Sequence, residues 1–101
     1  MPEAETYYKI TINDAHYYNP HEIRITKKVV WLAQLWDDPV CGESRARTLI
    51  MQVAGQGDTG ISFLKNMRTS INRQQPVIKE EKMRRTLEAI SREITRYVGR
   101  L

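Results

Sequence analysis

The sequence predicts an α+β fold, in which an N-terminal two-stranded antiparallel β-hairpin is followed by about four helices packed as a small bundle. Three observations lead to this prediction. Residues 6–12 and 22–26 both alternate with the period of two that is typical of strands. From residue 27 onward the apolar residues recur at helical spacing. A length of 101 residues favours one domain, covering residues 1–101, because two domains would each be close to the lower size limit for a stable core.

The predicted hairpin covers about residues 5–26. In its first strand Tyr8, Ile10 and Ile12 share one face, and a long connection leads to the second strand at residues 22–26. The β-branched, alternating residues of that second segment favour a strand.

A helix that begins at Pro20 is the competing interpretation of residues 19–26. Asn19 is a residue favoured at the N-cap, proline is favoured at the first helical position, and Glu22 would follow at the third. Such a helix would place one apolar stripe along its length, made of Ile25, Val29, Leu32 and Trp36. The sequence leaves the choice between strand and helix open.

Four helices are predicted at about residues 27–36, 43–54, 60–73 and 79–99. The first is apolar nearly all round after its first turn, so it is either buried on all sides or offers a surplus face to a partner. In the last helix the apolar residues are spaced alternately four and three apart. Packing against the helices of its own chain is the favoured interpretation of this stripe, because fewer than three full heptads are present. A homodimer seam is the alternative, formed by Met83, Leu87, Ile90, Ile94 and Tyr97.

Composition excludes several classes of protein. No apolar run approaches the roughly 18 residues that span a bilayer, so no membrane partner is expected. The first five residues, MPEAE, lack the apolar stretch of a secretory signal. The single cysteine, Cys41, cannot form a disulfide within the chain, which favours a reducing, cytoplasmic setting.

Charge is distributed unevenly along the chain. Residues 1–60 contain six basic and eight acidic side chains, a net charge of −2, whereas residues 61–101 contain ten basic and four acidic ones, a net charge of +6. A one-sided field raises the local concentration of opposite charge, so this asymmetry indicates a negatively charged partner for the C-terminal half.

The motifs that carry catalysis are missing or incomplete, so we expect no enzyme, no cofactor and no metal site. Residues 55–60, GQGDTG, match the spacing of a dinucleotide-binding loop, but such a fold needs several parallel strands. The same loop fails as a phosphate-binding P-loop, because Ile61 and Ser62 follow it where Lys and Ser or Thr are required. His16, His21 and Cys41 lack the paired spacing of a zinc site.

Two sets of residues are candidates for binding. Exposed aromatic side chains are typical anchors of protein interfaces, and four of the five tyrosines lie within the first 18 residues. The short apolar helix at 27–36 could also leave one indole for a partner. The candidate protein contacts are Tyr7, Tyr17, Tyr18 and Trp31.

The second set is a basic, polar face. No acid occurs between Asp58 and Glu80, and the polar residues of that stretch are of the kinds that contact phosphates and base edges. Helix 43–54, the glycine loop and helix 60–73 loosely match a helix–turn–helix, although the loop is longer than the usual three or four residues. The predicted nucleic-acid-binding or basic face consists of Lys65, Asn66, Arg68, Thr69, Asn72, Arg73, Arg85, Arg92 and Arg96.

Two functional hypotheses follow from these residues. The preferred one is a small non-catalytic regulator or inhibitor that acts by stoichiometric contact with a protein complex that handles nucleic acid. Phage-encoded inhibitors such as anti-CRISPR proteins have this size, which is an analogy of size alone. The alternative is direct DNA or RNA binding through the basic helix at 60–73.

Overall fold

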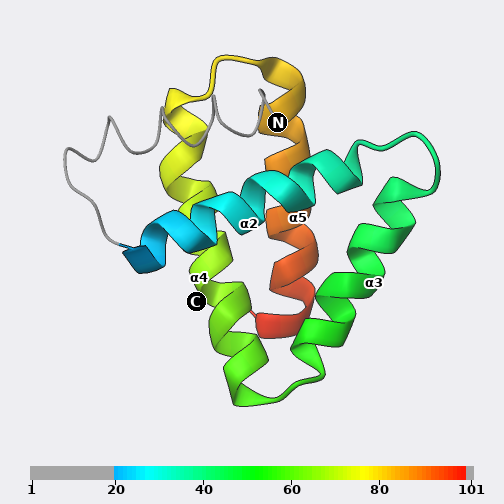
Figure 1. Ribbon diagram of the computed structural model, residues 1–101, viewed down its shortest axis with the longest axis vertical. Helices are drawn as coiled ribbons and strands as arrows, with labels where there is room; N and C mark the ends of the chain where they lie inside the picture. Colours follow the sequence, from blue (N-terminus) through cyan, green and yellow to red (C-terminus); the bar gives the residue numbers. More distant parts are fainter. Residues whose placement is uncertain (1–19, 100–101) are drawn as a thin grey trace.

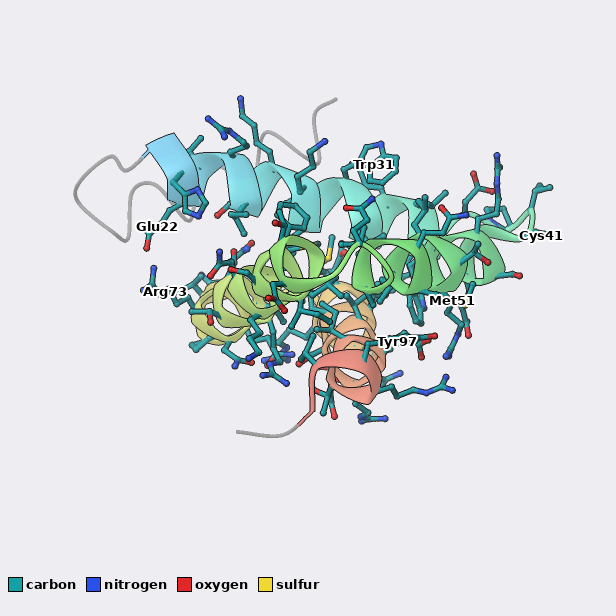
Figure 2. All side chains as sticks on the ribbon, turned by 90° about the horizontal axis from the view of Figure 1, so that it is seen from below. Glu22, Trp31, Cys41, Met51, Arg73 and Tyr97 are labelled. Carbon is teal, nitrogen blue, oxygen red and sulfur yellow. The ribbon has the colours of Figure 1, made fainter. Side chains whose placement is uncertain are left out.

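The structure is a computed structural model that describes residues 20–99, and within these residues it consists of helices joined by short turns, with no strand. The elements are α2 (Pro20–Trp36), α3 (Gly42–Ala54), α4 (Asp58–Gln74), the short 3-10 helix η1 (Gln75–Val77) and α5 (Glu81–Val98). Helices α3 and α4 form a V that is joined at its narrow end, and α5 runs between its arms (Figure 1). Helix α2 crosses this group on one side, and α5 lies on the side away from it (Figure 2). Within residues 20–99 no helix is both long enough and apolar enough to cross a membrane.

The predicted α+β class is wrong, because residues 22–26, predicted as a strand, form part of α2. The competing interpretation describes this segment, since α2 begins at Pro20 and carries Glu22 in its first turn. The apolar stripe that a helix from Pro20 implies is buried in the core; its members are Ile25, Val29, Leu32 and Trp36. Burial of a continuous helical stripe outweighs the local β preference of Ile23 to Thr26, which is worth less than the core contacts. The predicted first strand, residues 6–12, lies outside the described residues.

The later helices lie near their predicted positions. Helix α3 begins one residue before the predicted 43–54, α4 extends beyond 60–73 at both ends, and α5 is shorter than the predicted 79–99. The helix predicted at 27–36 is the C-terminal part of α2. Helix α4 ends at Gln74, two residues before Pro76, because proline cannot donate the backbone hydrogen bond that would continue the helix.

The apolar stripe of α5 forms the centre of the core. Met83, Leu87, Ile90 and Ile94 are buried, and Tyr97 is partly buried against the same cluster. Helices α2, α3 and α4 all contact α5, so these side chains are covered by helices of their own chain. The stripe therefore serves interior packing, as in the favoured interpretation, and its buried members are not offered to a second copy.

Two glycines permit close approach of backbone segments. A Cβ atom at Gly60 would lie 1.8 Å from the carbonyl oxygen of Val53, and one at Gly42 would lie 2.1 Å from that of Leu35. Gly57 has φ of 83°, a left-handed conformation that glycine adopts without strain. The glycines at 57 and 60 in the GQGDTG run thus serve the turn between α3 and α4 and its packing.

Replacing Gly60 with alanine should destabilise the protein by about 1–3 kcal/mol, because the new methyl group would overlap a backbone carbonyl that cannot move aside without shifting α3. Gly55→Ala is the matched control, since its nearest neighbours lie at 3.4 Å or more and its φ is −72°. Urea denaturation of both variants tests this. A Gly60→Ala protein as stable as the Gly55→Ala protein would contradict the close approach.

Truncating Leu87 or Ile90 to alanine should cost about 2–5 kcal/mol of folding stability, because both side chains are fully buried and each truncation leaves a cavity. Arg92→Ala on the exposed side of the same helix is the control, and it should change stability by no more than about 0.5 kcal/mol. Thermal and chemical denaturation measure both effects. A near-neutral Ile90→Ala would show that α5 does not pack as described.

Candidate functional site

The side of α2 that faces away from the core carries a half-exposed tryptophan that is preceded on the same stripe by two cations. Arg24, Lys28 and Trp31 follow one another at i, i+4 and i+7, so they form one stripe, which we term the outer face of α2. Trp31 is 49% exposed, and its indole points away from the other helices (Figure 2). Arg24 and Lys28 are exposed, whereas Leu35 is partly buried and packs against the core.

The two cations of the outer face have no acidic partner in the described part of the chain. Neither Arg24 nor Lys28 forms an ion pair or a side-chain hydrogen bond with any residue from 21 to 99. The acid of the same helix, Glu22, pairs instead with Arg73 on α4. The outer face therefore presents positive charge beside an exposed indole.

The acids at the C-terminal end of α2 are engaged elsewhere. Asp37 Oδ1 accepts a hydrogen bond from Thr86 Oγ1 at 2.8 Å, which ties the end of α2 to α5. Asp38 Oδ1 accepts one from the Val40 backbone N–H at 2.8 Å. The negative charge is thus confined to the turn that follows the helix, beyond Leu35.

Helix α4 places most of the predicted nucleic-acid-binding residues on one exposed side. Two of its three cations, however, bind other parts of the fold. Arg68 Nη1 donates to Thr95 Oγ1 at 2.9 Å and to the Gly99 carbonyl oxygen at 2.8 Å, so it holds the end of α5. Arg73 pairs with Glu22. Lys65 keeps its charge without such a partner, next to neutral polar side chains. Those exposed neutral residues are Asn66, Thr69 and Asn72.

On α5 the predicted basic residues are matched with carboxylates one turn away. Arg85 pairs with Glu81 at 3.1 Å, Arg92 pairs with Glu88, and Arg96 Nη1 lies 3.2 Å from Glu93. Hydrogen bonds from Arg84 and then Arg85 lower the pKa of the Glu81 carboxyl, which keeps it ionised beside them. The arginines of α5 therefore contribute less to an external field than their number suggests.

A buried carboxylate links α3 to α5. The Glu93 side chain is only 4% exposed and accepts hydrogen bonds from Arg47 Nη1 at 2.6 Å and from Arg96 Nη1. Arg47 also pairs with the exposed Glu43 at 2.9 Å, and its guanidinium carbon lies 4.9 Å from the centre of the Trp36 ring. The cluster is an ion-pair network that closes the α3–α5 contact. In the sequence, the sign of this network is that Glu93 lies next to the apolar stripe of the last helix.

No cluster of metal ligands is present between residues 20 and 99, where the structure brings no group of three or more His, Cys, Asp or Glu side chains together. Cys41 is exposed and stands at the N-cap of α3 with φ of 58°, a left-handed conformation. Its side chain forms no capping hydrogen bond. The glycine loop that precedes α4 is accounted for by helix packing.

Of the four residues predicted to contact a protein, the described part of the chain contains Trp31; Tyr7, Tyr17 and Tyr18 lie outside it. Arg24 and Lys28 were not predicted as site residues: the preferred strand at 22–26 separates Arg24 from Trp31, and Lys28, which shares the predicted helix 27–36 with Trp31, was overlooked as a contact. Helical numbering from Pro20 would have placed all three on one stripe. No protein-family model, no curated protein and no solved structure matches this chain.

Replacing Arg47 with methionine should destabilise the fold by about 1–3 kcal/mol, because the buried Glu93 carboxylate would lose one of its two donors. Glu43→Gln is the control. Glu43 is 56% exposed and shares the same arginine, so its loss should cost no more than about 1 kcal/mol. Denaturation curves of both variants measure the difference, and equal stabilities would contradict a stabilising role for the buried pair.

Proposed function

We propose that this protein is a small non-catalytic binding protein, a regulator or inhibitor that acts by stoichiometric contact with machinery that handles nucleic acid, and that the outer face of α2 makes this contact. The observation that carries the proposal is the exposure of Trp31. The other tryptophan of α2, Trp36, lies in the core, whereas the Trp31 indole is half in water. Tryptophan and arginine are enriched among the few residues that dominate binding energy at interfaces.

The charge around Trp31 indicates the character of the partner surface. Arg24 and Lys28 have no counter-ion among the described residues, so a partner with negative charge would gain attraction without displacing an existing ion pair. Assemblies that handle nucleic acid present such charge on the bound nucleic acid and on acidic protein surfaces. A positively charged face cannot imitate nucleic acid, which favours contact with a negatively charged component of the assembly.

Direct binding of nucleic acid through residues 60–73 has less support. Two of the three cations on α4, Arg68 and Arg73, hold other helices of the fold, and their withdrawal would weaken those contacts. Among residues 21–99 the other cations without an ion pair are Arg45, Lys65, Lys79 and Lys82, and none of them has an exposed tryptophan, tyrosine or phenylalanine on the same element. The outer face of α2 is therefore the better-supported contact.

Substitution of Trp31 tests the proposal. The immobilised protein should capture a nucleic-acid-handling assembly from an extract of its source cell, and Trp31→Ala should reduce capture about tenfold or more without lowering the melting temperature. Met51→Ala is the matched control, because Met51 is also 49% exposed but lies on α3.

Capture that is undiminished by Trp31→Ala would refute the contact surface. Capture of an assembly with no role in nucleic-acid metabolism would refute the functional class. Equal losses in Trp31→Ala and Met51→Ala would show that general surface hydrophobicity, and not the outer face of α2, causes the capture.

A further inference from the structure

Resting on the proposed function, we infer that the component bound by the outer face of α2 is single-stranded nucleic acid. Trp31 stacks on an unpaired base, and Arg24 and Lys28 contact neighbouring phosphates. This assignment joins the two features that distinguish the face, an indole that projects into solvent and two cations that have no counter-ion among residues 21–99. Proteins that bind single strands without sequence preference use the same two elements, aromatic platforms and a positively charged track.

The spacing along α2 fits a strand that follows the helix. Arg24 and Lys28 are four residues apart and Lys28 and Trp31 are three apart, so the stripe extends about 10.5 Å at 1.5 Å per residue. Nucleotides advance by about 3.4 Å each along one strand of a duplex and by more where bases are unstacked, so this length corresponds to at most about three nucleotides. One short segment of strand can therefore reach both cations and the indole.

The indole separates single-stranded from double-stranded ligands. In a duplex the faces of the bases are covered by their neighbours in the stack, and only the edges are open in the grooves. Arg24 and Lys28 could contact the phosphates of either form, but the flat face of Trp31 can stack only on a base that is unstacked and unpaired. Only a single strand therefore offers the exposed Trp31 indole a base on which it can stack.

A single strand also suits the shape of this surface better than an acidic protein does. The Trp31 indole projects from the convex side of a helix (Figure 2), so a protein partner would need a preformed pocket for the ring and acids placed opposite both cations. A single strand supplies a π-face and a negative charge at every nucleotide. The exposed Asp38, in the turn that follows α2, repels phosphate at that end and favours a strand that lies between Arg24 and Trp31.

Binding of the full chain to labelled oligothymidylate, and to a hairpin duplex of the same length, tests the inference. We expect binding of the single strand at low salt, accompanied by quenching of tryptophan fluorescence. With two phosphate contacts, log K should fall against log salt with a slope of about −1.4. Trp31→Ala should weaken binding about 5-fold to 150-fold and leave the slope unchanged. Arg24→Gln combined with Lys28→Gln should remove most of the slope.

Met51→Ala is the control that should bind as the wild type does, and circular dichroism confirms that each variant is folded. Failure to bind the single strand at low salt would overturn the inference, as would equal binding of the duplex or binding that is indifferent to Trp31→Ala. If oligothymidylate does not bind while nuclease-treated extract still yields a captured assembly that depends on Trp31, the ligand is a protein surface; the inference then fails and the proposed function stands. If neither binding nor capture depends on Trp31, both fail.

Discussion

Helix α2 is buried along one side only, and this one-sided burial determines both the packing of the molecule and its most distinctive surface. Val29 and Ala33 are fully buried, whereas Trp31, between them in sequence, is half exposed. The segment is apolar nearly all round, but α3, α4 and α5 contact it from one side. An apolar helix that crosses the outside of a helical group must leave part of its apolar surface in water, and Trp31 is that part.

The orientation of this outer face is set by contacts at both ends of α2. At its N-terminal end, Glu22 pairs with Arg73, and Thr26 Oγ1 lies 3.4 Å from Ser70 Oγ. Arg73 and Ser70 both belong to α4. At the other end, Gly42 lets α3 begin in contact with the Leu35 carbonyl oxygen. The helix is therefore held against rotation about its own axis, since a turn that buried Trp31 would break these contacts. A side chain held outward by a rigid scaffold loses less conformational entropy on binding than one on a loose segment.

A feature of this fold could be predicted from the sequence when the residues that determine it are close together in the chain. The stripe of α5 was predictable because a spacing of four and three from Met83 to Tyr97 is incompatible with a strand. The start of α2 was not, because Ile23 to Thr26 satisfies a strand pattern as well as a helical one, and only the core decides between them. The same ambiguity hid the alignment of Arg24 with Lys28 and Trp31, which depends on helical phase, although Trp31 was predicted. The engagement of Arg68 and Arg73 was not predictable, since their partners lie 27 to 51 positions away in the sequence.

Charge counted along the chain is consequently a poor guide to where the molecule attracts a ligand. The C-terminal residues 61–101 carry the excess of positive charge, yet the arginines among them that the structure describes pair with Glu81, Glu88 and the buried Glu93, or hold neighbouring helices. Residues 1–60 are net negative, yet they contain two cations that have no partner in the described part of the chain and lie beside an exposed aromatic ring. An ion pair already formed within the fold must be broken before its cation can serve a ligand fully, whereas Arg24 and Lys28 have no such internal competitor among the described residues. Available charge beside an exposed aromatic ring, and not the total charge, therefore favours α2 over the more basic C-terminal helices as the surface that meets an anion.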